Sequence, residues 1–380
     1  MINWLNKNNY LKREISIDGY TYEIYLKEKT AASKNFPRLV IVSYQPNKDA
    51  SELLRLCIKS IQKFTDTGYE LWIVDNNSPE ENIKWLDSVK GINIVYVRTD
   101  PGEDNGSYAN AVALEIAAKL INPESKYFLS LHEDTVVCRY GWLKYLLSKF
   151  DDKTKAVGFR LTKARVPEGV LHICGYIIDF QFFIKQGLNF LPQLPYLDTG
   201  DKAICEIRKS GFKIFCTPNT FDDKDLVGSI PETLAVKSIN ATRSFNDKNE
   251  IVYMHLGRGV SKAKKIYGNQ EKCSFEEWSE YIRSRLFSEP GLQVIDEKKL
   301  GDEDFLDFSI TEFYISNFLE ENLNLLSDKS SILYFGEKRE TLNRYNFNCS
   351  KYSEGSAYGS LSFDCVIFSE AIKYLDRMEY

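Results

Sequence analysis

Short apolar runs alternate with segments of helical length along the 380-residue chain, beginning at Arg38. The runs have the length of buried strands and lie at 39–42, 71–74, 92–97 and 127–131. The segments between them lie at 51–64, 80–89 and 107–121, and in the last of these apolar residues recur three and four positions apart. This alternation predicts parallel βαβ units, in which ligands bind beyond the carboxyl ends of the strands.

The pattern changes on either side of this region. Residues 14–26 alternate apolar and polar side chains around Asp18-Gly19, which predicts an N-terminal hairpin with a two-residue turn. Further along, the strands that we expect are less regular and lie at 156–159, 173–178, 212–216 and 251–255. Helices are expected at 201–210, before Gly211, and at 274–287, which opens with a capping-box sequence.

Composition narrows the class of protein. Apolar residues make up 43% of the chain, so it can bury a sizeable core and is not disordered. The 49 Lys+Arg and 54 Asp+Glu give a net charge of −5 without a basic block, which argues against a nucleic-acid partner. Neither a transmembrane run nor a signal peptide is evident, so we expect a cytoplasmic protein, either free or peripheral at the cytoplasmic membrane face.

Cysteine and histidine usage bear on metal chemistry. The eight cysteines form no CxxC pair, which favours reduced thiols and argues against zinc clusters and disulfide scaffolds. With three histidines in the whole chain, the position of each one is informative.

Polar clusters follow three of the predicted strands. Ser43 and Tyr44 follow the first, residues 75–78 follow the second, and residues 132–134 follow the fourth. Asp75 can accept hydrogen bonds from a base or ribose, and Asn77 and Ser78 offer further polar contacts. Turn chemistry is the competing explanation, because Asp, Asn and Ser also begin turns for local reasons.

The third cluster, His132-Glu133-Asp134, is the most specific. An imidazole and a carboxylate two positions apart point to the same side of an extended chain. The pair could therefore hold a divalent cation, and that cation a diphosphate. Acidic residues at a helix N-terminus are the structural alternative.

Taken together, these motifs resemble the family-2 glycosyltransferases, which are inverting enzymes with the GT-A fold. The resemblance covers about residues 36–259 and rests on the segments 41–44, 73–78, 105–110, 131–135 and 198–201, the last followed by Gly211. It implies an α/β fold with a mixed, mainly parallel sheet flanked by helices. It also implies a nucleotide-sugar donor, a D-x-D metal motif and a later Asp as catalytic base.

The resemblance assigns residues to roles. The metal, Mn²⁺ or Mg²⁺, is expected on Asp134, His132 and His255. His132 stands where Asp is usual, which bears on metal preference. The base is expected to be Asp201, with Asp198 as the second choice, although Asp201 could instead cap its helix. The residues expected to bind the donor are Ser43, Tyr44, Asp75, Asn77, Asn105, Gly106, Asn110, Glu133 and Arg258.

His255 and His172 differ in how far their surroundings in the sequence support a role. His255 follows a predicted strand and precedes Gly257-Arg258-Gly259, whose glycines permit close approach of Arg258 to a phosphate. His172 has no motif around it, and we interpret it as structural or as facing an acceptor.

The C-terminal part has a second, fainter resemblance. The runs 331–336 and 363–370 resemble strand motifs of class I methyltransferases, but one Gly stands where a G-x-G turn is expected. We interpret this part as an incomplete Rossmann-like module. The expected division is an N-terminal hairpin extension over 1–35, a GT-A domain over 36–262, a helical bridge over 263–327 and this segment over 328–380.

The leading hypothesis is a metal-dependent inverting glycosyltransferase that uses a UDP-, GDP- or dTDP-sugar and a glycan, lipid-linked or protein acceptor. An inactive nucleotide-sugar binding module of a glycan assembly complex is the alternative. A methyltransferase would rest on the C-terminal runs alone. A nucleotidyltransferase is disfavoured because residues 43–47 are not a Gly-rich, basic loop.

Overall fold

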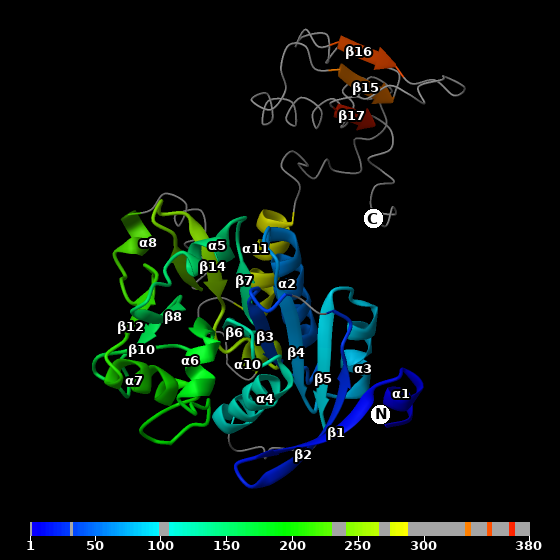
Figure 1. Cartoon of the computed structure of the whole chain (residues 1–380). Coiled ribbons are helices and arrows are strands. Elements are labelled where there is room, and N and C mark those ends of the chain that lie inside the picture. Colours follow the sequence, from blue (N-terminus) through cyan, green and yellow to red (C-terminus); the bar gives the residue numbers. More distant parts are fainter. Residues whose placement is uncertain are drawn as a thin grey trace. The chain divides into compact units, whose positions relative to one another are not determined.

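A computed structural model describes most of the first 287 residues and three strands beyond them (Figure 1). The described residues are 2–30, 33–98, 106–229, 241–265, 274–287, 331–335, 348–351 and 365–368. The chain divides into two units, Met1–Glu289 and Pro290–Tyr380. The finer division into four parts stays a prediction.

Within the described residues, the first unit is built on a nine-stranded sheet. Its order is β1 (Leu11–Ile17), β2 (Tyr20–Lys27), β5 (Ile92–Val97), β4 (Glu70–Asn76), β3 (Arg38–Ser43), β6 (Tyr127–His132), β11 (Gly175–Asp179), β8 (Thr154–Gly158) and β12 (Lys213–Cys216). Strands β2 and β11 run opposite to the other strands of this sheet. The expected mixed, mainly parallel α/β sheet is confirmed.

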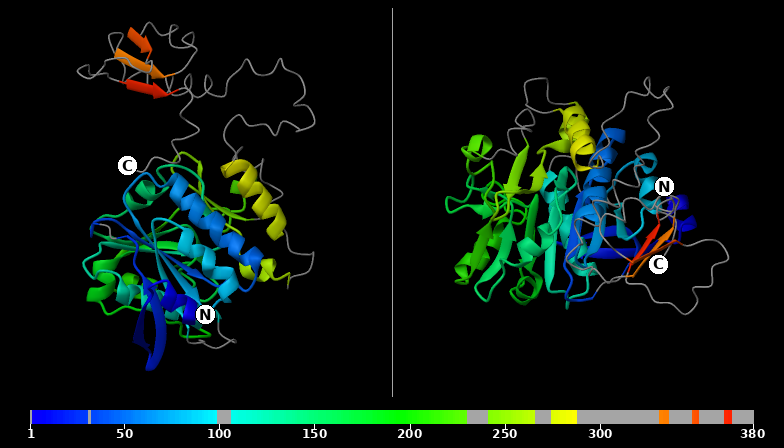
Figure 2. Two further views of the ribbon diagram at one scale, coloured as in Figure 1. Left: turned by 90° about the vertical axis from the view of Figure 1, so that its right-hand side faces the viewer. Right: turned by 90° about the horizontal axis from the view of Figure 1, so that it is seen from above.

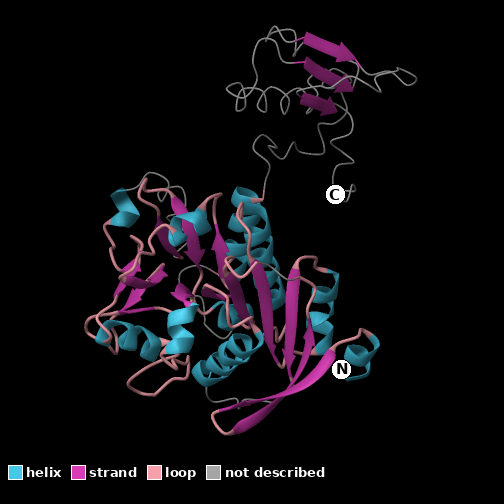
Figure 3. Ribbon diagram, viewed as in Figure 1, coloured by secondary structure: helices cyan, strands magenta, loops and turns pink. Residues whose placement is uncertain are grey.

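Helices cover both faces of this sheet (Figure 3). Side chains alternate along β3, so Leu39 and Ile41 pack with α2 (Lys48–Phe64) and α5 (Trp142–Leu147), while Val40 packs with α4 (Gly106–Leu120). All three of these β3 side chains are fully buried. Truncating one of them to alanine should cost about 2–5 kcal/mol of unfolding free energy, or less for the smaller valine.

One predicted helix differs from expectation. The segment 80–89 forms a single α-helical turn, α3 (Glu80–Ile83), followed by a 3₁₀ helix over Lys84–Ser88. The carbonyl of Asn82 accepts hydrogen bonds from the Ser51 hydroxyl at 3.0 Å and the Trp85 indole at 2.8 Å. Because that oxygen is engaged by side chains, the α-helical ladder does not continue through it.

A second sheet brings a distant strand to the end of β6. Its order is β13 (Thr242–Phe245), β14 (Ile251–His255) and β7 (Thr135–Val137), all antiparallel, and β7 follows β6 after a two-residue turn. The short helix α10 (Gly259–Ala263) follows β14. Helix α11 (Phe275–Leu286) then lies beside α2 (Figure 2) and begins with the predicted capping box.

The remaining elements frame this core. The predicted hairpin is confirmed as β1–β2, and β2 continues into the large sheet by pairing with β5. Helix α7 (Asp201–Lys209) begins and ends as expected, with Gly211 at φ +80°. The shorter elements are α1 (Ile2–Lys7), β9 (Leu161–Thr162), β10 (Val170–Leu171), α6 (Phe180–Lys185) and α8 (Leu226–Ser229).

The second unit contains three described strands that pair in parallel. Their order is β16 (Asn348–Lys351), β15 (Ser331–Phe335) and β17 (Cys365–Phe368). Strands β15 and β17 coincide with the two predicted runs, and their parallel pairing fits a Rossmann-like fragment. Of the predicted helical bridge over 263–327, residues 288–327 lie outside the described residues.

Candidate functional site

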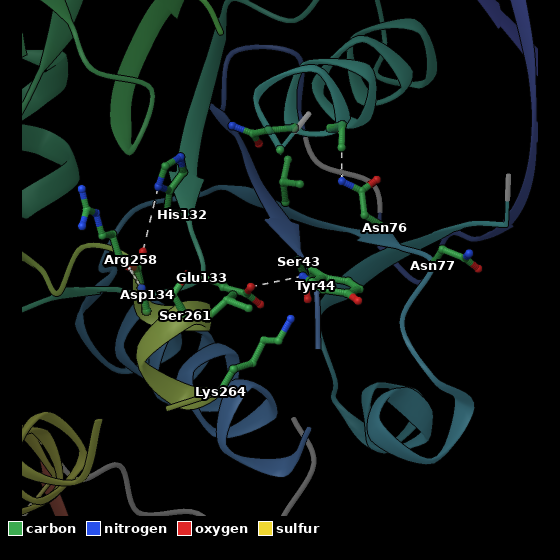
Figure 4. A pocket seen from close by; sticks show the side chains of 16 residues that line it. Ser43, Tyr44, Asn76, Asn77, His132, Glu133, Asp134, Arg258, Ser261 and Lys264 are labelled. Atoms are coloured by element: carbon green, nitrogen blue, oxygen red, sulfur yellow. Dashed lines mark hydrogen bonds and ion pairs between the residues drawn. The ribbon is translucent and has the colours of Figure 1, made fainter. Parts of the chain in front are cut away.

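A cavity of about 730 Å³ opens at the carboxyl edge of the parallel strands (Figure 4). This volume is typical of a small-molecule site, about 300–1,000 Å³. Five chain segments form its wall: the ends of β3 and β4, the start of α4, the turn after β6, and α10 with its flanks. The lining residues are Val42, Ser43, Tyr44, Asn76, Asn77, Gly106, Ala109, Asn110, His132, Glu133, Asp134, Arg258, Gly259, Val260, Ser261 and Lys264.

The turn between β6 and β7 places His132 and Asp134 in this wall. His132 is the last residue of β6, and its carbonyl accepts a hydrogen bond of 2.7 Å from the Thr135 hydroxyl. The chain thereby turns tightly from the large sheet into the small one. The imidazole Nδ1 of His132 lies 3.9 Å from Oδ1 of Asp134, so the two side chains share one side as predicted.

His255 reaches the same point from the small sheet. It is the last residue of β14 and pairs with Thr135, and the Leu256 amide donates to the Asp134 carbonyl at 3.0 Å. Nε2 of His255 then lies 3.3 Å from Oδ1 of Asp134.

Gly259 is in close contact with Asp134. Its amide donates to Oδ2 of Asp134 at 2.9 Å, and a Cβ at position 259 would lie 2.3 Å from the Asp134 Cβ. Such a contact cannot be accommodated without a shift of the backbone, so this close approach requires glycine.

Three side chains are grouped as a metal site would require. One ligand atom from each of His132, Asp134 and His255 lies within 4.8 Å of the others. Nε2 of His132 is buried without a hydrogen-bond partner, and Nε2 of His255 lies beside the Asp134 carboxylate. Buried imidazole nitrogens are normally bonded, so Nε2 of His132 fits a cation that supplies its missing partner. Two imidazoles and a carboxylate suit Mn²⁺ at least as well as Mg²⁺.

The ionisable side chains of this group shift one another's pKa values. Burial raises the pKa of Asp134, but His255, His132 and the Gly259 amide outweigh it, so that pKa lies well below its usual value. Burial lowers the pKa of His132 to about 4, which keeps this imidazole neutral and able to bind a metal at pH 7. Burial also lowers the pKa of His255, but Cys174 and Asp134 outweigh it and raise the pKa to about 10. A cation would take the place of that proton.

Glu133 lines the cavity between the His132–Asp134–His255 group and the end of β3. Its Oε1 accepts from the Tyr44 amide at 3.1 Å, while its buried Oε2 has no hydrogen-bond partner. Burial raises the pKa of this carboxyl well above its usual value. An unpartnered oxygen in a cavity wall fits a ligand hydroxyl or N–H group.

Asp75 does not line the cavity, which differs from its expected contact with a donor. It is fully buried, and its carboxylate accepts from the Ser78 hydroxyl, from the Ser78 amide at 3.1 Å and from Arg98 at 2.6 Å. Burial raises its pKa. Asp75 therefore holds the turn that presents Asn77, which has φ +56°.

The two candidate bases differ in exposure, and neither lines the cavity. Asp201 is 2% exposed, and its Oδ2 accepts from the Asp198 amide at 2.8 Å. The Asp198 side chain is 31% exposed and pairs with Arg165 at 3.0 Å. Asp198 is therefore the more accessible of the two carboxylates, and which of them is the base stays a prediction.

The pKa shifts of the two carboxyls run in opposite directions. Burial raises the pKa of Asp201. Burial also raises that of Asp198, but hydrogen bonds from Ser107 and the Thr199 amide, with the nearby charge of Arg165, lower it below its usual value.

Most of the predicted donor-binding residues are brought together, and the cavity adds others. Asn105 lies outside the described residues. Asn76, Ser261 and Lys264 line the cavity but were not predicted. Lys264 projects into it toward Tyr44 (Figure 4). Three lysines occur at 262, 264 and 265, and the sequence carries no signal to tell which one faces the cavity.

No family model and no curated protein sequence matches the chain. Among solved structures it is similar to a mannosyltransferase from Pyrobaculum calidifontis, PcManGT, in complex with GDP-Man and Mn²⁺. That match has 14% identity and a TM-score of 0.37, and covers 48% of this chain and 54% of the other. The chain thus spans about half the length of that protein.

Other similar structures include the galactosyltransferase LgtC in complex with donor and acceptor sugar analogues. This match has 12% identity and a TM-score of 0.38, and covers 67% of this chain and 98% of that one. TarS 1–349 of S. aureus matches at 10% identity and a TM-score of 0.35, covering 48% and 57%. Likenesses this distant do not indicate what this chain binds.

Among the described helices, none combines the length and the apolar character needed to cross a membrane.

Proposed function

We propose that this chain is a metal-dependent inverting glycosyltransferase that transfers a sugar from a nucleotide-sugar donor. The observation that carries the proposal is the His132–Asp134–His255 group in the wall of a cavity of about 730 Å³. A diphosphate needs a cation and basic side chains, and this cavity offers both a ligand group and the side chains of Arg258 and Lys264.

The lining suggests how a donor would lie. The polar ends of β3 and β4, with Tyr44, Asn77 and Glu133, would receive the base and ribose. The diphosphate would face His132, Asp134, Arg258 and Lys264. Tyr44 is 43% exposed and offers a ring face to a base. A UDP-, GDP- or dTDP-linked sugar fits this scheme.

The reaction would be a single displacement. The acceptor oxygen forms a bond to the anomeric carbon while the bond from that carbon to the donor phosphate breaks. Asp198 takes the acceptor proton, and the electron pair of the broken bond leaves with the nucleoside diphosphate. When bound, a divalent cation neutralises negative charge on that leaving group. The low pKa of Asp198 keeps its carboxylate ionised and ready to accept a proton.

A second candidate is a nucleotide-sugar binding module without catalysis. The observation in its favour is the burial of Asp201, which removes the carboxylate that the family resemblance assigns as base. Slow hydrolysis of the donor in the presence of Mn²⁺ would separate an enzyme from such a module. The acceptor, whether a glycan, a lipid-linked sugar or a protein, is part of the proposal in either case.

The test is a thermal-shift series with UDP-, GDP-, dTDP- and CMP-linked sugars, with and without Mn²⁺ or Mg²⁺, followed by assay of donor hydrolysis. We expect a metal-dependent rise in Tm for one base. Asp134→Asn should abolish that rise, because it removes the charge that holds the cation. Asp152→Asn, at an exposed position that does not line the cavity, is the matched control. A wild-type protein that neither binds nor hydrolyses any donor contradicts the proposal.

A further inference from the structure

A second cavity lies beside helix α2 and shares no lining residue with the first. Its volume is about 380 Å³, within the range of about 300–1,000 Å³ that is typical of small-molecule sites. Side chains of α2, of the 3₁₀ helix Lys84–Ser88 and of the end of α11 form its wall. Because α2 and α11 lie side by side (Figure 2), we call this cavity the α2 groove.

The α2 groove is positively charged. Arg55, Lys59 and Arg283 line it, together with one acidic residue, Glu52. The Glu52 carboxylate is paired with Arg283 at 2.8 Å. Within the described part of the chain, neither Arg55 nor Lys59 has a carboxylate partner. Two positive charges therefore lack a counter-charge here, although the net charge of the whole chain is −5.

An indole ring holds Arg55 in position. The guanidinium carbon of Arg55 lies 4.0 Å from the ring centroid of Trp85, which is a cation–π contact. The indole N–H of Trp85 donates to the side-chain oxygen of Gln45 at 3.1 Å and to the carbonyl of Asn82 at 2.8 Å. Since Gln45 and Asn82 are both buried, the ring is itself fixed. A guanidinium over a ring face keeps N–H groups that can bind an anion.

A phenyl ring lies beside the second cation. The ammonium nitrogen of Lys59 is 4.5 Å from the ring centroid of Phe287. Lys63 donates to the carbonyl of Leu286 at 2.9 Å, and this bond ties the end of α11, with Phe287, to α2. Lys59 follows Arg55 by one helical turn, so the two cations can reach one ligand between them.

We propose that the α2 groove binds a phosphate monoester group, carried by a small molecule or by a lipid headgroup. A phosphate monoester carries a charge of about −1.5 to −2 at pH 7 and three strong acceptor oxygens. This charge matches the two cations without a counter-charge, and an arginine fork beside a lysine suits phosphate oxygens. A carboxylate or a phosphodiester has one negative charge and would leave one of the cations without a counter-charge. The inference does not depend on the proposed function.

The test is calorimetric titration of the full chain with inorganic phosphate, after treatment with EDTA and dialysis. Arg55→Gln and Lys59→Gln each remove one charge from an exposed side chain, so both variants should keep the wild-type Tm. We expect each variant to raise the Kd for phosphate about tenfold, because one charge-assisted contact is lost. Lys48→Gln is the matched control, since Lys48 is exposed on the same helix and lines neither cavity. Its Kd should equal that of the wild-type protein.

Lys264→Gln distinguishes the two cavities, because Lys264 lines the first one only. If phosphate binds in the α2 groove, this variant leaves the tenfold effects of Arg55→Gln and Lys59→Gln in place. A Kd that responds to Lys264→Gln and not to these two variants would assign the phosphate to the first cavity and overturn the inference. An equal effect of Lys48→Gln would show that only the total charge matters, which also overturns it.

Sedimentation with vesicles separates the two sources of phosphate. Phosphatidylcholine vesicles that contain phosphatidic acid present a monoester, whereas vesicles with the same share of phosphatidylglycerol present a diester. Preferential binding to phosphatidic acid that Arg55→Gln and Lys59→Gln weaken would identify a lipid headgroup. Binding of inorganic phosphate without such vesicle binding would identify a soluble phosphorylated ligand. Equal binding to both kinds of vesicle without binding of inorganic phosphate, or no binding of either probe, contradicts the proposal.

Discussion

The amide of Gly259 donates to Oδ2 of Asp134 at 2.9 Å, although the two residues are 125 positions apart. The carboxylate that is central to the candidate metal group is therefore held by a backbone that only glycine allows. A methyl group at position 259 would meet the Asp134 side chain at 2.3 Å.

Gly259→Ala should therefore separate folding from metal binding. We expect a loss of about 1–3 kcal/mol of unfolding free energy from overpacking, and a larger loss in Mn²⁺-dependent nucleotide affinity by calorimetry. Gly187→Asn is the control, because Gly187 has φ +59° with no atom near its Cβ position, and asparagine tolerates that conformation. Unchanged metal-dependent affinity in Gly259→Ala would show that the loop relaxes.

His132 should make the metal-free protein less stable in mild acid. Its folded-state pKa is about 4, below the usual 6.5, because its burial disfavours the charged form. As the pH falls from about 6.5 to 4, the unfolded chain binds a proton that the folded chain does not, so the unfolding free energy decreases.

His132→Asn removes this contribution. The unfolding free energies of the two proteins, measured by denaturant unfolding with EDTA, should differ by an amount that changes by about 1–2 kcal/mol between about pH 6.5 and about pH 4. This change is smaller than the full pKa shift would give, because the His132 ring is 28% exposed. Glu133, whose pKa burial raises, contributes the opposite slope in both proteins and cancels in the comparison. Parallel curves would contradict the assigned pKa.

Asp198 and Asp201 should respond differently to substitution. We expect Asp198→Asn to lower kcat about 10²–10⁴-fold with nucleotide affinity intact, because it removes the proposed general base. Asp201→Ala should instead lower Tm, since the buried carboxylate accepts from the Asp198 amide at 2.8 Å. If Asp201→Asn abolishes transfer at normal stability while Asp198→Asn does not, the base is Asp201.

Lys264 should contribute to binding of the diphosphate. Lys264→Gln is expected to raise the Kd for the nucleoside diphosphate about tenfold and to leave that for the nucleoside unchanged, because a charge-assisted contact is lost. Lys265→Gln is the matched control, since Lys265 is 72% exposed and pairs with Glu276 at the surface. Equal effects of the two variants would indicate a general loss of charge instead of a specific contact.

The metal should be Mn²⁺ in preference to Mg²⁺. Mg²⁺ favours oxygen ligands, whereas two of the three grouped side chains are imidazoles. Titration of the EDTA-treated protein with each ion in the presence of the nucleotide should give a Kd for Mn²⁺ at least tenfold lower. Tighter binding of Mg²⁺ would show that the histidines are not ligands.

The strand and helix pattern predicted the core of the fold because βαβ units are built from local periodicity. The ends of β3, β4 and β6 meet for the same reason, so Ser43, Asn77 and Asp134 were predicted to lie together. The approach of His255 depends on the pairing of β14 with β7, a contact between distant segments that periodicity does not encode. Here the family resemblance supplied what the pattern did not.

The solvent exposure of the site side chains and their hydrogen-bond partners could not be predicted from the sequence, for another reason. Asp75 and Asn77 are both polar residues that follow the same predicted strand, and the sequence gives no reason to separate them. In the structure, Arg98 and Ser78 donate hydrogen bonds to the Asp75 carboxylate, while Asn77 lines the cavity. Asp198 and Asp201 are likewise both carboxylates of one short segment. The Asp201 carboxylate is buried and accepts a hydrogen bond from the Asp198 amide, whereas the Asp198 side chain is partly exposed. These differences follow from three-dimensional packing, which a single sequence does not report.

His132 ends a strand of the nine-stranded sheet, whereas His255 ends a strand of the three-stranded sheet. An ion bound by both imidazoles would join the two sheets through its own coordination bonds. The free energy of binding would then add to the free energy that keeps the small sheet, α10 and α11 in place. Donor affinity and resistance of this subdomain to local unfolding would accordingly rise and fall together.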